Sequence, residues 1–269
     1  MSTKIVVLEG YASNPGDLSW EKFAALGELT VYDRTAPEEI LPRIRDAQIV
    51  LINKTRLTAE LLAQCPHLRM IGVMATGYNV VDIDAAKRLG IAVCNVPGYS
   101  TMAVAQMTFA LLLEMTQQVG LHNSSVHAGR WTQAPDFCYW DAPLTELDGK
   151  TMGIIGYGKI GQAFGKVAQA LGMRLLVCAN HRRPELESDT CRFADLDTVL
   201  AESHVVSLHC PQTPATEKII NRETLAKMRP GALLLNTGRG GLLDEAAVAE
   251  ALRSGRLGGA AVDVVSAEP

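Results

Sequence analysis

The chain has 269 residues, a length that favours two domains because a single domain usually holds about 100 to 200 residues. Hydrophobic residues make up 48% of the chain and charged residues 20%, a composition typical of folded α/β proteins and unlike that of disordered or fibrous ones. The net charge of −4 gives the protein no positive field with which to attract nucleic acid or an anionic membrane, so we expect neither as a partner.

Cysteine usage and the apolar segments predict a cytoplasmic protein. The six cysteines are scattered without a CxxC pair, and several lie in apolar runs, as expected of reduced thiols; no metal site is predicted. The apolar run that ends at Glu9 is too short for a signal peptide. The most apolar long stretch, residues 104–115, contains Gln106 and Glu114 and falls short of a membrane span. We therefore expect neither export nor a membrane anchor.

Short runs of β-branched residues and leucine alternate with segments of helical length along the first part of the chain. The predicted strands are residues 5–8, 29–32, 49–52, 70–73 and 91–94. Apolar runs of this kind predict a parallel sheet that helices cover on both faces. We assign residues 1–98 to a first domain.

A long helical stretch follows the sequence Pro97-Gly98-Tyr99-Ser100. Residues 101–127 predict one uninterrupted helix that connects two domains, with Ser100 as its N-cap and Gly129 just past its end. A polar and aromatic loop, residues 130–148, comes next. The remaining predicted strands, residues 151–155, 175–178, 205–208, 232–235 and 260–264, indicate a second parallel sheet, so residues 99–269 form the second domain.

The strand at 151–155 leads directly into the sequence GYGKIG at 156–161, and an amphipathic segment follows it. Strand, glycine turn and helix in this order predict a dinucleotide site. Gly156 permits the tight turn, Gly158 lets the backbone approach a pyrophosphate, and Gly161 allows the helix to pack closely on the strand. Free N–H groups at the start of the helix would bind the pyrophosphate. Two alternatives remain: a flexible loop that matches the motif by chance, and the glycine turn of a methyltransferase.

The residues after the next predicted strand bear on the choice between NAD and NADP. An NAD site usually has Asp or Glu here to bind the adenosine ribose, but the sequence reads Ala179-Asn180-His181-Arg182-Arg183. Absence of the carboxylate and the presence of two guanidiniums suit a 2′-phosphate, so we favour NADP over NAD, with Asn180, Arg182 and Arg183 in the cofactor site. The alternative is that both arginines belong to a solvated loop.

Several further segments make the sequence similar to a known family. They are residues 75–82 (ATGYNVVD), residues 205–211 (VVSLHCP) with TPAT at 213–216, residues 235–240 (LNTGRG), Gly129-Arg130-Trp131, and Val262-Asp263-Val264 before Glu268-Pro269. In order and spacing they resemble the signature segments of the D-isomer-specific 2-hydroxyacid dehydrogenases, and the resemblance covers nearly the whole chain. Residues 75–82 and 144–147 (LTEL) are most similar to the glycerate dehydrogenases and the hydroxypyruvate or glyoxylate reductases.

The resemblance implies two doubly wound parallel-sheet α/β domains. One is a flavodoxin-like substrate domain, residues 1–98, lacking the C-terminal segment that returns to it in the family. The other is a Rossmann dinucleotide-binding domain, residues 99–269. The implied reaction is hydride transfer between NAD(P)H and a small 2-oxo or D-2-hydroxy acid, with hydroxypyruvate, glyoxylate or D-glycerate as substrate.

The resemblance also implies the residues that bind substrate. Arg239 would bind the carboxylate and the carbonyl of a 2-oxo acid and stabilise the charge that develops on the carbonyl oxygen. The backbone amides of Thr76 and Gly77 would hold the substrate carboxylate. Glu268 would be the acid that pairs with the catalytic histidine and raises its pKa. The alternatives are a surface or helix-capping role for Arg239 and an ordinary turn at 76–77.

A further set of residues is implied at the cofactor. Lys159 and Ile160 would lie at the pyrophosphate, and Cys210, Pro211 and Thr216 would line the ribose and nicotinamide. Thr237 would lie below the ring, Gly238 would also bind the cofactor, and Asp263 would orient the carboxamide. The resemblance also implies a homodimer joined through residues 101–119, with packing inside the monomer as the alternative. Asn53, Lys54 and Tyr99 are candidates for the pocket that selects the 2-oxo acid.

The family's catalytic histidine follows the glutamate after a proline-rich loop, and none of His67, His122, His127, His181, His204 or His209 matches it. We therefore expect the chain to be a truncated form of a longer protein rather than an unusual protein with an impaired site. Loss of a general acid typically lowers the rate about 10²- to 10⁴-fold. The chain should bind cofactor and reduce hydroxypyruvate slowly.

Two other functions are considered. A corepressor-like binding protein that senses dinucleotide can use the same fold, and it would bind cofactor tightly with negligible turnover. A methyltransferase is disfavoured, because it leaves Arg239 and Glu268 without a role.

Overall fold

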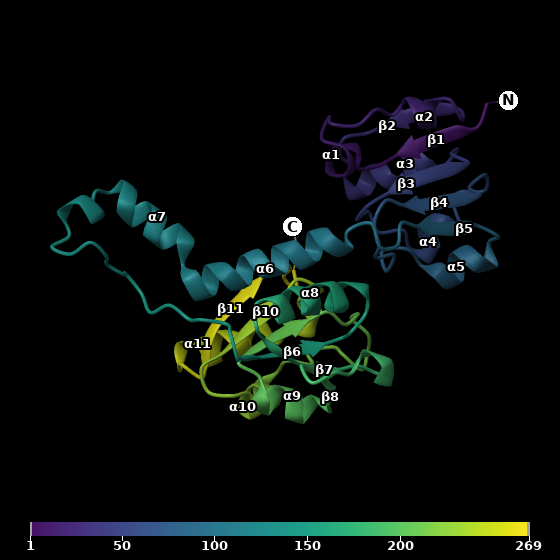
Figure 1. Cartoon of the computed structure of the whole chain (residues 1–269). Coiled ribbons are helices and arrows are strands. Elements are labelled where there is room, and N and C mark those ends of the chain that lie inside the picture. The colour runs from purple at the N-terminus through teal and green to yellow at the C-terminus, as the bar shows by residue number, and fades with distance from the viewer. Residues whose placement is uncertain (1, 268–269) are drawn as a thin grey trace. The chain divides into compact units, whose positions relative to one another are not determined.

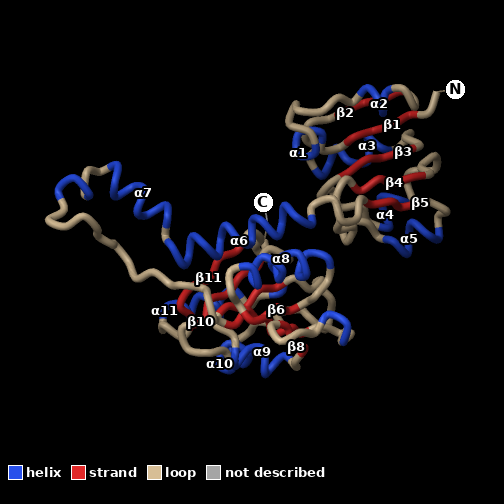
Figure 2. Tube along the Cα trace, in the orientation of Figure 1, coloured by secondary structure: helices blue, strands red, loops and turns tan. Residues whose placement is uncertain are grey.

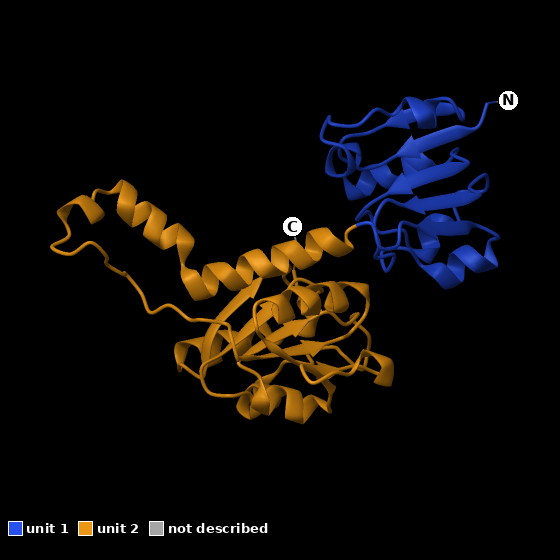
Figure 3. Ribbon diagram, viewed as in Figure 1, with its two compact units in different colours: residues 1–99 blue, residues 100–269 orange. Residues whose placement is uncertain are grey.

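The computed structural model of the chain describes residues 2–267 (Figure 1). The chain divides into two compact units, residues 1–99 and residues 100–269, which we call the first and the second unit (Figure 3). Each unit is an α/β structure with one parallel sheet. The predicted fold class, two parallel-sheet α/β domains, is confirmed.

The first unit contains a five-stranded parallel sheet in the order β2-β1-β3-β4-β5. The strands are β1 (Lys4–Val7), β2 (Glu28–Val31), β3 (Ile49–Ile52), β4 (Met70–Val73) and β5 (Ala92–Asn95), and the helices are α1 (Gly10–Ser13), α2 (Glu21–Ala24), α3 (Ile40–Ile44), α4 (Ala59–Leu62) and α5 (Ile83–Arg88). This is the flavodoxin-like order, in which the direction of winding reverses between β1 and β3. Ligands of such sheets bind beyond the carboxyl ends of the strands at that point.

Alternating side chains of the strands supply the apolar core of the first unit. Leu8, Ile52 and Ile71 are fully buried on one face of the sheet, and Ile5 and Val7 are buried on the other. A sheet covered on both faces needs apolar residues at successive positions, which is why the sequence shows continuous apolar runs here.

The second unit contains a six-stranded parallel sheet in the order β11-β10-β9-β6-β7-β8, and Figure 2 draws strands in red. Its strands are β6 (Thr151–Ile155), β7 (Arg174–Cys178), β8 (Cys191–Phe193), β9 (Val205–Leu208), β10 (Ala232–Asn236) and β11 (Leu257–Val262). Counted from β6, this is the Rossmann order 3-2-1-4-5-6. Strand β8 was not predicted, because it has three residues and the charged Arg192 at its centre.

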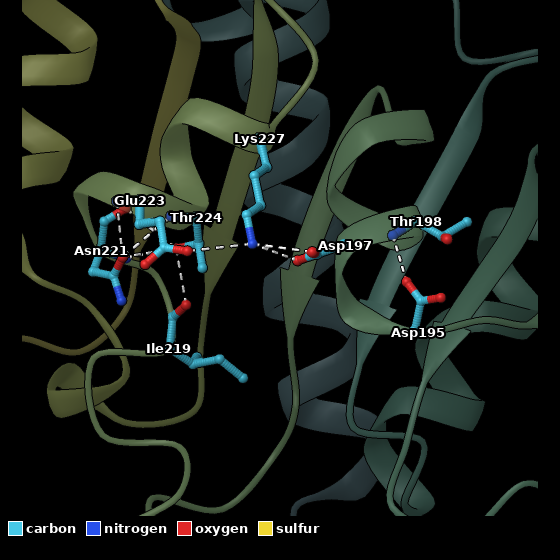
Figure 4. A network of polar contacts seen from close by, with 8 residues as sticks. All are labelled: Asp195, Asp197, Thr198, Ile219, Asn221, Glu223, Thr224 and Lys227. Carbon is cyan, nitrogen blue, oxygen red and sulfur yellow. Dashed lines mark hydrogen bonds and ion pairs between the residues drawn. The ribbon is translucent and has the colours of Figure 1, made fainter.

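The helices of the second unit include α8 (Lys159–Ala170), α9 (Leu196–Glu202), α10 (Arg222–Lys227) and α11 (Glu245–Arg253). Polar contacts connect α9 and α10 (Figure 4). The ammonium of Lys227 lies 3.0 Å from both carboxylate oxygens of Asp197 and 3.4 Å from Glu223, and the Asn221 side chain caps the start of α10. These charges are exposed, so the ion pairs contribute at most about 1 kcal/mol each.

The prediction of one uninterrupted helix over residues 101–127 is wrong. Helix α6 (Thr101–Gln117) ends and α7 (Val119–His127) begins at Gln118, which has the left-handed conformation φ +48°, ψ +47°. The Glu114 carboxylate accepts hydrogen bonds of 3.2 and 3.1 Å from the N–H of Gly120, a group at the start of α7. Ser100 occupies the N-cap position of α6, but its side chain makes no capping hydrogen bond, so that part of the prediction is also wrong.

Helix α6 packs within the second unit against α8, β10 and β11, whereas α7 has no buried residue. We call residues 119–140 the arm. Its exposed apolar side chains are Val119, Leu121, Val126, Trp131, Phe137 and Trp140, and Phe137 is 90% exposed. Between residues 2 and 267, no helix combines the length and apolar character that a membrane crossing requires.

Candidate active site

The glycine turn lies at the carboxyl end of β6, where its three glycines meet different surroundings. Gly156 has φ +95°, and a Cβ added there would lie 2.4 Å from the backbone nitrogen of Cys210. A Cβ on Gly161 would lie 2.3 Å from the carbonyl oxygen of Gly156, so the close approach of α8 requires glycine. A Cβ on Gly158 would meet no atom within 4 Å. The fold itself requires glycine at 156 and 161, while Gly158 borders open space.

The N-terminus of α8 offers free donors at the same turn. Within the described residues, the N–H groups of Lys159, Ile160 and Gly161 have no acceptor, and the N–H of Gln162 donates to the carbonyl of Gly158 at 3.0 Å. Gly158 is the N-cap and supplies no side-chain cap. Unpaired N–H groups and the positive end of a 12-residue helix form an anion site. The residues present therefore fit the pyrophosphate of a dinucleotide.

The loop that follows β7 carries the residues predicted to choose between NAD and NADP. Asn180, Arg182 and Arg183 are exposed. The guanidinium of Arg182 donates two hydrogen bonds of 2.9 Å to the carboxylate of Glu187, and these bonds lower the pKa of that carboxyl. Arg183 donates to the carbonyl of Tyr157, in the glycine turn, at 3.5 Å. Sequence reasoning missed the pairing with Glu187, because nothing in a sequence shows which exposed charges meet.

Cys210 follows β9, and its backbone nitrogen lies beside Gly156 of the glycine turn, while Pro211 and Thr216 lie further along the same loop. Thr216 braces this loop, since its hydroxyl donates to the carbonyl of Pro211 at 2.7 Å and accepts from the N–H of Thr213 at 2.8 Å. Burial raises the pKa of the Cys210 thiol to about 11, so the group is a neutral thiol at pH 7. A thiol that stays neutral at this pH is not a nucleophile.

His209 directly follows β9, and its contacts are those of a residue that stabilises the fold. Its Nε2 is 2.9 Å from the Ser207 hydroxyl, and its ring packs against Phe164 with centroids 5.2 Å apart. Burial lowers the pKa of His209 to about 4. At neutral pH this imidazole carries no extra proton to donate, in agreement with the expectation that it does not replace the catalytic histidine.

Arg239 follows β10 on a loop that Asn236 holds in place. Asn236 is fully buried; its amide donates to the carbonyl of Arg239 at 2.9 Å, and its side-chain oxygen accepts from the N–H of Gly238 at 3.1 Å. The guanidinium of Arg239 is exposed and donates to the carbonyl of Gly238 at 2.8 Å. Thr237 is tied to α6 through a hydroxyl contact of 2.8 Å with Thr108. Sequence reasoning missed Asn236; a buried amide at the last position of a strand was the available signal.

Asp263 lies just past β11, exposed, with its N–H donating to the carbonyl of Asn236 at 3.0 Å. The last strand is therefore aligned with the Arg239 loop at the carboxyl edge of the second sheet. Glu268, predicted as a catalytic acid, lies outside the described residues.

In the described part of the first unit, two loops at the carboxyl edge of the sheet present backbone N–H groups, and those of one loop are free. Among the described residues, the N–H groups of Thr76 and Gly77, after β4, have no acceptor. Their loop is held by the Thr76 hydroxyl, which donates to the carbonyl of Val96 at 3.1 Å, and by the Asn95 amide, which donates to the carbonyl of Thr76 at 2.8 Å. Free amides on a braced loop suit a small carboxylate.

The second set follows β3 and is filled by the protein itself. The carboxylate of Glu9 accepts hydrogen bonds from the N–H groups of Asn53 at 2.7 Å, Lys54 at 2.8 and 3.0 Å, and Thr55 at 2.9 Å. Sequence reasoning did not single out Glu9. The 44 residues that separate it from Asn53 hide the contact, which depends on β1 and β3 being neighbours.

The predicted residues thus gather at the carboxyl edges of the two sheets. The second unit carries the glycine turn and the loops after β7, β9, β10 and β11 at one edge, and the first unit carries Thr76 and Gly77 at the edge of its own sheet. A cavity of about 620 Å³ in the second unit lies elsewhere, lined by Thr151, Arg174 and His204 among others at the amino ends of the strands. Because dinucleotides bind at carboxyl ends, that cavity is not the cofactor site. No group of three His, Cys, Asp or Glu side chains in residues 2–267 is arranged to hold a metal ion.

A parallel sheet in Rossmann order, with a glycine turn and free amides at its carboxyl edge, defines a dinucleotide-binding protein. Residues 109–269 match the family described as D-isomer specific 2-hydroxyacid dehydrogenase, NAD binding domain. The chain is 54% identical over 269 residues to a hydroxypyruvate reductase of Blautia hydrogenotrophica, a match that covers 99% of this chain and 84% of that protein.

Two solved structures are also similar over nearly the whole chain. One is the D-lactate dehydrogenase of Aquifex aeolicus with NAD and lactic acid, at a TM-score of 0.85 and 28% identity, covering 98% of this chain and 77% of that one. The other is an acyclic imino acid reductase with NADPH and D-Arg, at a TM-score of 0.86 and 28% identity, covering 99% and 84%. This chain belongs to the D-isomer-specific 2-hydroxyacid dehydrogenases, which are NAD(P)-dependent oxidoreductases. The family resemblance and the enzyme class predicted from the sequence are confirmed.

Proposed function

We propose that the substrate is a small 2-oxo acid, either hydroxypyruvate, which is reduced to D-glycerate, or glyoxylate, which is reduced to glycolate, with D-glycerate oxidised in the reverse reaction. The observation that carries this is the braced loop of Arg239, because an exposed guanidinium on a fixed backbone suits an adjacent carboxylate and carbonyl. The 54% identity to a protein named hydroxypyruvate reductase supports the same substrate class.

The roles of the substrate residues follow from their donors. Arg239 would hydrogen-bond the substrate and stabilise the negative charge on the carbonyl oxygen in the transition state. The free N–H groups of Thr76 and Gly77 would bind the carboxylate. We keep Glu268 as the acid that raises the pKa of a histidine partner.

The cofactor supplies the hydride and receives it back in the reverse reaction. We propose that the N–H groups of Lys159, Ile160 and Gly161 bind its pyrophosphate beside Gly156 and Gly158. Cys210, Pro211, Thr216, Thr237 and Gly238 would line the ribose and nicotinamide, and the exposed Asp263 would orient the carboxamide.

We further propose a preference for NADP(H). Asn180, Arg182 and Arg183 are exposed after β7, and residues 179–183 include no Asp or Glu that would repel a 2′-phosphate. Arg182 is exposed and Glu187 is partly exposed, and a 2′-phosphate carries more negative charge than a carboxylate, so it can displace Glu187 from Arg182. The named cofactors of similar proteins include both NAD and NADPH.

The test is equilibrium binding and turnover with both cofactors and both acids. Fluorescence titration should give tighter binding of NADPH than of NADH, and oxidation of NADPH should depend on hydroxypyruvate or glyoxylate. Arg239→Ala should abolish binding of the acid without changing cofactor affinity, and Arg253→Ala, on an exposed helix end, is the control. Tight cofactor binding with no acid-dependent signal from the wild-type chain would favour the dinucleotide-sensing alternative, which the names of the relatives do not support.

We also propose that the protein is a cytoplasmic homodimer. The face of α6 that does not pack in the second unit carries Met102, Met107 and Leu113, and the adjoining arm exposes Phe137 and Trp140. Several large apolar side chains exposed along one continuous segment favour an interaction surface. Light scattering should give a dimer for the wild type and a monomer for the double variant Phe137→Ser, Trp140→Ser. A monomeric wild type would refute the proposal.

A further inference from the structure

The strongest unassigned feature of the first unit is the carboxylate of Glu9 in the backbone amides of residues 53–55. We propose that Glu9 is a positioning residue that sets which 2-oxo acid is accepted, because it fixes the loop that contacts the substrate side chain. The inference rests on the proposed function, since it concerns the same substrate.

The contact joins a single side chain to the backbone of a whole loop. One carboxylate receives hydrogen bonds from three successive N–H groups, at 2.7 to 3.0 Å. Glu9 lies just past β1, and the three amides lie just past β3, the neighbouring strand. Charge-assisted hydrogen bonds of this length are about twice as strong as neutral ones, so the loop has little freedom.

The contact between Glu9 and residues 53–55 lies at the part of the first sheet where a ligand is expected. Strands β1 and β3 flank the point where the winding of this sheet reverses, which is where ligands of such sheets bind. Strand β4, which carries Thr76 and Gly77 beyond its end, is the next neighbour of β3. Neighbouring strands are about 4.8 Å apart, so a small acid bound at 76–77 reaches the loop after β3.

Occupation of one set of amides also directs the substrate. The carboxylate of Glu9 fills the amides of 53–55, so a substrate carboxylate is left with those of Thr76 and Gly77. The atoms of the acid beyond its carbonyl then meet residues 53–55. Asn53 is half-buried, and its side-chain amide has no hydrogen-bond partner among the described residues, so it can bind a hydroxyl. Hydroxypyruvate carries a CH₂OH group where glyoxylate carries only hydrogen.

The test compares both acids on one variant. Glu9→Gln keeps the shape of the side chain but removes its negative charge, so the hydrogen bonds from the N–H groups of residues 53–55 are weakened and the loop gains freedom. The full chain is saturated with NADP⁺, in which state neither acid can be reduced, and binding of each acid is measured by calorimetry. Affinity for hydroxypyruvate should fall about tenfold and affinity for glyoxylate by less than about twofold.

The control is Gln48→Ala. The side chain of Gln48 accepts a hydrogen bond of 2.6 Å from the N–H of Lys4, and thus joins β3 to β1 at the opposite edge of the sheet. This variant should leave the ratio of the two affinities unchanged, whatever its effect on the unfolding temperature. An equal loss for both acids, or no loss, in Glu9→Gln overturns the role of Glu9 alone. Failure of the wild-type complex to bind either acid overturns the proposed function and this inference with it.

Discussion

Replacement of single glycines in the turn separates what the fold requires from what the cofactor requires. In Gly156→Ala, the new Cβ lies 2.4 Å from the Cys210 nitrogen and 2.6 Å from the His209 carbonyl carbon, both backbone atoms, at φ +95°. The left-handed conformation costs a non-glycine residue about 1–2 kcal/mol, and overpacking costs about 1–3 kcal/mol. The sum of about 2–5 kcal/mol lowers the unfolding temperature by about 4–20 °C, at about 2–4 °C per kcal/mol.

Gly158→Ala should behave in the opposite way. The added Cβ meets no protein atom within 4 Å, and φ −74° suits alanine, so folding loses only the difference between glycine and alanine as an N-cap, about 1 kcal/mol or less. The methyl group occupies the space where the pyrophosphate approaches the free amides. Loss of one charge-assisted hydrogen bond costs about 1.5–3 kcal/mol, or about 10- to 150-fold in cofactor affinity.

Thermal unfolding and fluorescence titration of NADPH measure the two effects on the same samples. Gly156→Ala should be the less stable variant, and Gly158→Ala should be nearly as stable as the wild type while it binds cofactor weakly. A Gly158→Ala protein with wild-type affinity would show that no phosphate lies over this turn, and the assigned cofactor geometry would be refuted.

Three further predictions concern other parts of the second unit. Glu187→Gln removes the carboxylate that pairs with Arg182, so titration should show the affinity for NADPH relative to NADH rising about 3- to 10-fold. The control is Glu202→Gln, which frees Arg192 instead. An unchanged affinity ratio in Glu187→Gln would contradict the assignment of Arg182 to the 2′-phosphate. Asn236→Ala leaves the carbonyl of Arg239 and the N–H of Gly238 without this partner, which should cost about 1–3 kcal/mol in urea unfolding and weaken binding of the acid. Wild-type values for both measurements would contradict a positioning role for Asn236. The pKa of His209 falls from 6.5 to about 4 on folding because the ring is buried, so the unfolded chain binds more protons between these values and stability must fall as the pH drops from 6.5 towards 4. At 1.36 kcal/mol per pKa unit, the loss of unfolding free energy approaches about 3 kcal/mol. The unfolding free energy should therefore change less between pH 7 and pH 5 in His209→Gln than in the wild type, although part of the change remains because burial also lowers the pKa of His204. Equal changes in the two proteins would refute the effect.

Strand positions could be predicted from the sequence because they depend on short-range physics. Runs such as Ile49–Ile52, and Val205–Leu208 apart from Ser207, are apolar at successive positions, and a strand covered on both faces buries such a run. Prediction from the local sequence failed at a very short strand and at a helix break that lacks the usual residue type. The three residues of β8 form no apolar run, and the break between α6 and α7 occurs at Gln118 without the glycine that usually marks a left-handed residue.

The sequence by itself determined where the glycine turn lies, because that part of the site depends on residues that are close together in the chain. Gly156 and Gly161 have no side chain because their neighbours leave no room, and this requirement is readable as a motif. Only the tertiary structure decided the contacts between distant residues. Glu9 meets Asn53 because β1 lies beside β3, Arg182 meets Glu187 because the loop after β7 folds back, and Asn236 meets the Arg239 carbonyl because the chain turns after β10. A hydrogen bond depends on the positions of both partners in space, and the order of residues along a chain fixes those positions only after the chain has folded.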